Sequence, residues 1–251
     1  MTTDQTGGGR NRTWLLLAFS IPALALLLAL GTWQVQRLQW KEGLLQRIET
    51  RIHADPIALE EIAALQEEGA DIDYRPTAVS GTFLHEAEQH YLATWQGASG
   101  FFVHTPLRLS DGRYIFVNRG FVPYDRKEPD TRAEGQVRGT VEIEGLARTA
   151  PADKPSFIVP DNDPAKNIYY WKDLQAMTRA ASLPEGEVYP FYVDAGAGAN
   201  PGGLPVGGVT RINLPNNHLQ YAITWYGLAF ALVCVLVAWF WRARADDSGK
   251  A

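Results

Sequence analysis

The chain has 251 residues, of which 46% are hydrophobic and 20% charged, so it is long and apolar enough to bury a core. Its net charge of −5 argues against the basic footprint of nucleic-acid-binding proteins, and we expect no nucleic-acid partner. A single cysteine excludes an intrachain disulfide and a multi-cysteine metal site.

The first predicted element is a membrane-spanning helix over residues 14–33 (WLLLAFSIPALALLLALGTW), a run without charged residues. At about 1.5 Å per helical residue, such a run spans the roughly 30 Å hydrocarbon core of a bilayer. Trp14 and Trp33 flank the run, as is typical of side chains at the headgroup level. The alternative is a cleaved signal peptide, but signal sequences have shorter apolar cores, and this run continues into a predicted helical segment over residues 34–50.

The middle of the chain is dominated by strand patterns. A short helix is predicted over residues 57–68, after the Asp55-Pro56 pair. Segments rich in β-branched and aromatic residues predict strands at 74–84, 89–95, 101–109, 114–122, 135–148 and 188–194. Asp111-Gly112 predicts a hairpin, residues 167–181 a helix, and residues 195–208 a Gly/Pro-rich loop leading back to the membrane. Strands joined by short turns favour an antiparallel barrel with a helix packed on it.

A second uncharged run covers residues 222–241 (AITWYGLAFALVCVLVAWFW) and predicts a second membrane-spanning helix, which with its N-terminal cap covers residues 214–241. Arg242 and Arg244 follow it directly. Basic residues next to a span favour the cytoplasmic side, so this helix places the C-terminus, and with it the N-terminus, in the cytoplasm.

The predicted fold class is therefore an integral membrane α+β protein, in which two transmembrane helices flank a β-rich, antiparallel, barrel-like extracytoplasmic domain. The predicted order is a cytoplasmic tail (1–13), a transmembrane helix (14–33), a periplasmic domain (34–213), a transmembrane helix (214–241) and a second cytoplasmic tail (242–251). The Gly-rich first thirteen residues, which include Asp4, do not resemble a transit peptide, so we expect a bacterial plasma membrane.

Few residues offer chemistry. His85 and His90 are five residues apart, whereas a zinc-protease helix needs a spacing of four, so we expect no metal site there. His218 lies in the first turn of the second span, with Tyr221 and Trp225 on its face. It is either a ligand for haem iron or an interfacial histidine in an aromatic belt, and the residues alone favour the belt.

Four stretches, in order, resemble the surfeit locus protein family of cytochrome c oxidase assembly factors. They are residues 30–41 (LGTWQVQRLQWK), 81–83 (GTF), 117–123 (VNRGFVP) and 217–228 (NHLQYAITWYGL). The resemblance extends from about Leu15 to Trp241, which is nearly the whole chain. Four motifs in the expected order are far more specific than any single motif.

This resemblance implies an assembly factor that is not an enzyme. It implies that His218 is the ligand of haem iron and that haem a is the cofactor. Tyr221 and Trp225 are then candidate neighbours of the haem face, with packing in an aromatic belt as the alternative. Arg37 and Lys41 are candidates for contacts with haem propionates or, in the alternative we favour, with lipid headgroups. The implied partners are the catalytic subunit of the oxidase and membrane lipid, with a haem a synthase as a further candidate. A scaffold that holds the catalytic subunit without stable haem binding is the alternative function.

Overall fold

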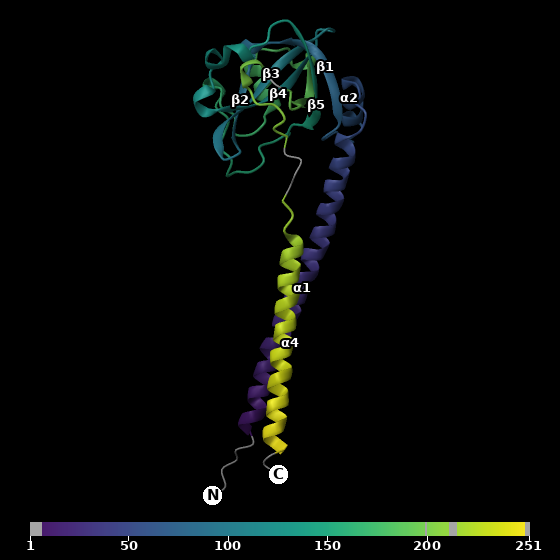
Figure 1. The fold of residues 1–251 in the computed structure, drawn as a ribbon, viewed down its shortest axis with the longest axis vertical. Helices are drawn as coiled ribbons and strands as arrows, with labels where there is room; N and C mark the ends of the chain where they lie inside the picture. Colours follow the sequence, from purple (N-terminus) through teal and green to yellow (C-terminus); the bar gives the residue numbers. More distant parts are fainter. Residues whose placement is uncertain (1–6, 199, 211–214, 249–251) are drawn as a thin grey trace. The chain divides into compact units, whose positions relative to one another are not determined.

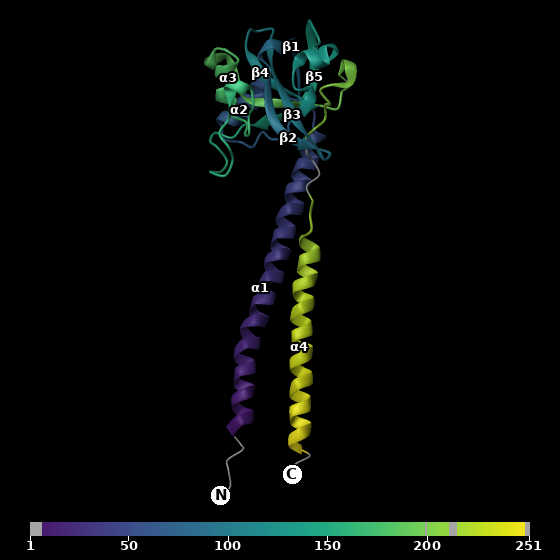
Figure 2. The same ribbon diagram turned by 90° about the vertical axis from the view of Figure 1, so that its left-hand side faces the viewer.

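The computed structural model describes residues 7–198, 200–210 and 215–248. Contacts within the chain divide it into two units. Residues 1–47 with 213–251 form one, which we call the helical unit, and residues 48–212 form the other, which we call the sheet unit. Figures 1 and 2 show the elements of each.

Two long helices make up the helical unit. They are α1 (Gly7–Ile52), of which residues 48–52 belong to the sheet unit, and α4 (His218–Ser248). Both contain windows of high mean hydropathy, 2.3 and 2.1. Large apolar side chains are exposed along them, such as Phe19 (76%) and Phe230 (72%). Exposed apolar surface of this kind is favourable in lipid, so both helices are candidate membrane-spanning helices, as predicted.

Six strands form one sheet in the sheet unit. They are β1 (Pro76–Phe83), β2 (Gln89–Trp95), β3 (Ala98–Leu109), β4 (Tyr114–Pro123), β5 (Thr140–Thr149) and β6 (Val188–Ala195). Their order is β1-β5-β6-β4-β3-β2, and a further antiparallel pairing joins β1 to the end of β3. This additional pairing brings the sheet round on itself, so the predicted barrel-like α+β fold is confirmed.

The interior of this sheet is apolar. Leu107, Ile115, Val117, Phe191 and Val193 have no exposed surface. The short helix α2 (Leu59–Glu67) packs its buried residues against the same core, and its existence agrees with the helix predicted over residues 57–68. The predicted Asp111-Gly112 turn also forms: the backbone N–H of Arg113 donates to Asp111 Oδ1 at 3.0 Å, and Gly112 has φ +90°.

The prediction of a purely antiparallel sheet is wrong at one position. β4 and β6 pair in parallel, whereas every other strand pair in the described sheet is antiparallel. Parallel neighbours need a long crossover between them. Here the chain between β4 and β6 carries β5 and α3 (Leu174–Ala180), and local strand patterns could not reveal this pairing.

The predicted helix over residues 167–181 is also wrong in its first half, because α3 begins only at Leu174, after Asp173 caps it. Asn167 adopts a left-handed backbone conformation with φ +49°. The next residues lie along β2 instead: the N–H of Tyr169 donates to His90 O at 2.9 Å, and Leu92 N–H donates to Tyr169 O at 2.8 Å. Pairing with a strand edge therefore overrides the local helical pattern.

The loop over residues 195–208 is more than a linker. Val206 pairs with Phe121 of β4 through two backbone hydrogen bonds of 2.8 and 2.9 Å. A Cβ atom on Gly120 would lie 1.9 Å from Val206 O, and Gly120 has φ +123°. Only glycine allows this approach. The predicted boundary of the second span at residues 213 and 214 lies outside the described residues.

Candidate functional site

His218 is the first residue of α4. The helix start agrees with the predicted start signal, since the backbone N–H of Tyr221 donates to Asn217 O at 3.2 Å. The His218 side chain is partly buried. The histidine therefore lies at the polar end of an apolar helix, at the position where the sequence predicted it.

The imidazole of His218 is held by α1. Its Nδ1 atom lies 2.7 Å from Oε1 of Gln34, a residue that is only 8% exposed. An amide oxygen accepts hydrogen bonds and cannot donate them, so in this geometry the ring proton is on Nδ1. In the neutral form of the ring Nε2 then carries the lone pair, and no described residue makes a hydrogen bond to it.

A second contact between α1 and α4 involves Tyr226. Its hydroxyl lies 3.0 Å from Oγ1 of Thr32, which itself donates to Leu28 O at 2.9 Å. A Cβ atom on Gly31 would lie 2.9 Å from the Tyr226 ring, so a larger residue would push this ring away. The glycine and the tyrosine therefore allow close approach of the two helices near His218.

Lys41 makes a third contact between the two segments, since its Nζ donates to Pro215 O at 2.5 Å. Arg37 stacks its guanidinium 3.9 Å above the ring of Trp40. Both cations are candidates for contacts with haem propionates or lipid headgroups. In the structure each has a partner within the helical unit. Together the contacts bring residues 30–41 and residues 215–228 side by side in antiparallel directions.

The two aromatic candidates on α4 differ in their surroundings. Ala222 and Ala229 are each 3% exposed and mark the face of α4 that packs on α1. Trp225, three residues after Ala222, is partly buried, whereas Tyr221 is 54% exposed. Neither makes a ring contact with His218 in the described residues, so the structure places Trp225 beside the packed face and Tyr221 outside it.

The chemistry of this site fits haem. A neutral imidazole with one free ring nitrogen is a common axial ligand of haem iron. Among the residues that the structure describes, no group of three or more His, Cys, Asp or Glu side chains is placed to hold a metal ion. A single imidazole can supply one axial ligand to haem, whose porphyrin supplies the equatorial ligands.

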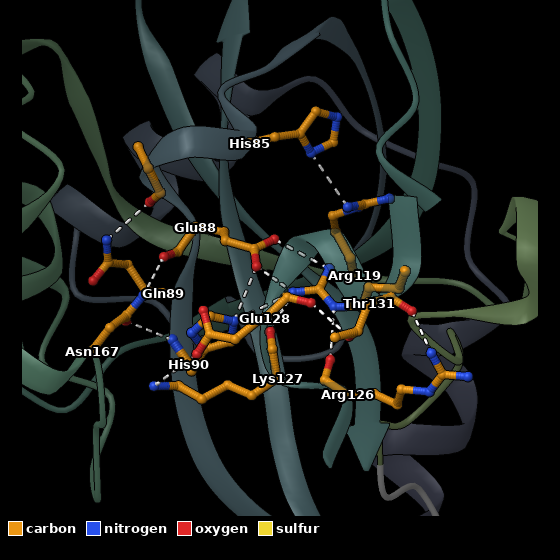
Figure 3. A network of polar contacts seen from close by, with 12 residues as sticks. His85, Glu88, Gln89, His90, Arg119, Arg126, Lys127, Glu128, Thr131 and Asn167 are labelled. Carbon is orange, nitrogen blue, oxygen red and sulfur yellow. Dashed lines mark hydrogen bonds and ion pairs between the residues drawn. The ribbon is translucent and has the colours of Figure 1, made fainter. Parts of the chain in front are cut away.

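A separate cluster of charged groups lies inside the sheet unit (Figure 3). The Glu88 carboxylate forms an ion pair with Arg132 and lies 3.0 Å from Nε2 of His90. Arg132 also donates to the carbonyls of Arg126 and Lys127, at 3.1 and 2.9 Å. The Glu88, His90 and Arg132 side chains are no more than 3% exposed. This buried network therefore ties β2 to the loop that follows β4.

Arg119 of β4 lies beside this network. It donates to Gly135 O and to Asn200 Oδ1, and its guanidinium stacks 4.7 Å above the ring of Phe83. Burial, with repulsion from Arg132, lowers the pKa of Arg119 to about 10, against the attraction of Glu88. Its hydrogen-bond partners in the loops are the Gly135 carbonyl and the Asn200 side chain, which indicates a structural role.

The two histidines of the HEAEQH stretch do not share a site. His85 lies in a 3₁₀ turn, and its Nε2 lies 2.7 Å from Val137 O. Burial lowers the pKa of the His85 imidazole. His90 belongs to β2 and pairs with Glu88. Each histidine therefore has its own protein partner.

Sequence reasoning missed Gln34 as part of the site. The signal was an amide one position after the first apolar run ends, inside the motif at residues 30–41. It could not be recognised, because its partner His218 lies 184 residues further along the chain.

One family model and several known proteins are similar to this chain. The model of the SURF1 family matches residues 21–230. Surfeit locus protein 1 of Rattus norvegicus is 38% identical over 244 residues, which cover 91% of this chain and 74% of the rat protein. The same protein of Homo sapiens is 37% identical over 235 residues, covering 87% and 74%. The SURF1-like protein of Monosiga brevicollis is 39% identical over 259 residues, covering 98% and 93%.

The buried network can be tested without any ligand. Burial alone would raise the pKa of Glu88, but hydrogen bonds from His90 and Arg132 and the charge of Arg132 outweigh it, so the folded pKa lies below the ordinary 4.5. This contribution to stability is present above pH 4.5 and is lost as the pH falls through the lower folded value.

We predict that Glu88→Gln destabilises the protein by about 3 kcal/mol at pH 7, because it leaves the Arg132 charge buried without its partner. As the pH falls below 4.5, the stability of the variant should also decrease less than that of the wild type. Denaturant unfolding of the detergent-solubilised protein, followed by tryptophan fluorescence, measures both effects. Glu142→Gln, at an exposed site on β5, is the matched control. Equal stability of the two variants would contradict a stabilising network.

Proposed function

The chain belongs to the SURF1 family, and from this membership we propose that it is a membrane-bound assembly factor for a haem-copper cytochrome c oxidase. In this role it binds haem a and assists its insertion into the catalytic subunit, without catalysing a reaction. A haem a synthase is the candidate donor of the haem. The proposal combines the family membership with the position of His218, the first residue of the second apolar helix.

The observation that supports haem binding is the hydrogen bonding of the His218 imidazole. Its Nδ1 is occupied by Gln34, so Nε2 is the nitrogen that would hold the iron. When bound, haem a supplies an iron that takes an imidazole as axial ligand. Trp225 and Tyr221, which lie on the same side of α4 as His218, offer ring surface that suits an apolar macrocycle.

We propose a bacterial plasma membrane as the location, with both termini in the cytoplasm and the sheet unit in the periplasm. Arg242 and Arg244, directly after the second apolar run, support this orientation through the positive-inside rule. Two spans place both termini on the same side.

A reporter that is active only in the cytoplasm should therefore work when fused to either end of the full chain. A reporter inserted at residue 187, an exposed glutamate, should be inactive there. Activity at residue 187 together with inactive terminal fusions would reverse the proposed orientation.

Haem binding is tested by removing the imidazole. The protein, produced together with the enzymes of haem a synthesis and purified in detergent, should show a haem a absorption band. His218→Ala should lose this band, because the other four histidines, at positions 53, 85, 90 and 104, belong to the sheet unit. His53→Ala, at an exposed histidine of the sheet unit, should keep it. A band of unchanged position and strength in His218→Ala would contradict haem ligation by this residue.

A scaffold function is supported by a different observation. Phe157 and Ile158 are 93% and 77% exposed in the sheet unit, at a turn closed by a hydrogen bond from Val159 N–H to Ser156 O of 3.2 Å. Turn positions normally carry small or polar residues. Two apolar side chains on such a turn are typical of a protein docking site.

The two functions separate in one experiment. If the protein is a scaffold, Phe157→Ser with Ile158→Ser should reduce co-purification of the catalytic subunit at least tenfold and leave any haem a band unchanged, since the turn belongs to the sheet unit. His218→Ala should then leave co-purification unaffected. Undiminished co-purification of the turn variant would exclude this turn as the docking site.

A further inference from the structure

The partner of His218 suggests how the proposed haem ligand is controlled. Gln34 follows the first apolar run by one position, yet it is 8% exposed and its amide oxygen lies 2.7 Å from His218 Nδ1. By contrast, Gln36, two residues later on the same helix, is exposed. The two side chains point to different sides of α1, and Gln34 is the one that faces α4.

The hydrogen bond at Nδ1 decides which ring nitrogen is free. In a neutral imidazole, one nitrogen carries the proton and the other the lone pair, and the hydrogen bond made by one nitrogen selects the form. An acceptor at Nδ1 places the proton there and leaves Nε2 as the electron-pair donor. Ligating histidines in proteins are commonly oriented through the same second nitrogen.

The acceptor here is a neutral amide rather than a carboxylate. A carboxylate at Nδ1 draws the proton strongly and makes the imidazole a stronger donor to a metal. An amide fixes the same orientation while adding no charge. The imidazole then stays an ordinary donor, which suits a ligand that must be handed on rather than kept.

We propose that Gln34 is a positioning residue, which holds His218 as the Nδ1–H form with Nε2 open and keeps its bond to haem exchangeable. The proposal rests on the proposed haem binding. It also gives a functional reason for the pairing of α1 and α4, because Gln34 and His218 are 184 residues apart in the chain and meet only when the helices pair. Neither helix alone carries both.

The ligand-free protein provides the first test. We would label histidine with ¹⁵N in the full chain in detergent, assign His218 by comparison with His218→Ala, and record the nitrogen shifts. The wild type should show the Nδ1–H form. Gln34→Leu, of similar size but without an acceptor, should shift the signal toward the Nε2–H form, and Gln34→Glu should restore Nδ1–H. Gln36→Leu is the matched control and should resemble the wild type.

Haem binding provides the second test. Gln34→Leu should weaken haem a affinity about tenfold, the lower end of the effect of removing a partner of a metal ligand. Gln34→Glu should restore affinity and slow haem release to apomyoglobin by a similar factor, because its carboxylate strengthens the donor. The rescue by glutamate separates a positioning role from general loss of structure in Gln34→Leu.

The outcomes distinguish the two proposals. If the wild type binds no haem but Gln34→Leu changes the His218 form, the haem function and the exchangeable haem bond both fail, and only the control of the His218 form by Gln34 stands. If His218→Ala loses haem while Gln34→Leu changes neither the imidazole form nor the affinity, the positioning role is overturned and the haem function stands. An Nε2–H form in the wild type would also overturn it.

Discussion

The hydrogen bond between Gln34 and His218 joins α1 to the first residue of α4, where the apolar run of each helix gives way to polar residues. It can form only if α1 and α4 pack closely, and Gly31 permits this by accepting the Tyr226 ring against its backbone. Lys41 adds a contact to the backbone just before α4. The candidate site is therefore a product of helix pairing, and its one ligand is oriented by a residue from the other helix.

The sheet unit is stabilised independently of that site. Its closed sheet surrounds an apolar core, and the pair of Glu88 and Arg132 ties the loops to β2. Buried charges of this kind are costly unless each is paired and hydrogen-bonded, which the network achieves through backbone carbonyls. The apolar side chains of the turn at Phe157 and Ile158 lie outside this core and are exposed.

Sequence patterns predicted the features that depend on local chemistry. The apolar runs, the strands and the Asp111-Gly112 turn could all be identified, because length, alternation and turn residues act over a few positions. The parallel pairing of β4 with β6 and the strand-like Tyr169 could not, since both depend on distant neighbours. The same limit applied to the site: His218 was predicted from its place at a helix start and its family resemblance, whereas Gln34 was visible only once the helices were paired.

We propose that Nε2 of His218 binds the iron of haem a while Gln34 holds Nδ1. Pulsed electron paramagnetic resonance of the ferric, haem-loaded protein, grown on histidine labelled with ¹⁵N only at the ε2 position, tests it most directly. We predict a coupling from a coordinated ¹⁵N nucleus that His218→Ala abolishes and His53→Ala retains. The absence of any ¹⁵N coupling in the haem-loaded wild type, or a coupling that survives in His218→Ala, would contradict the account.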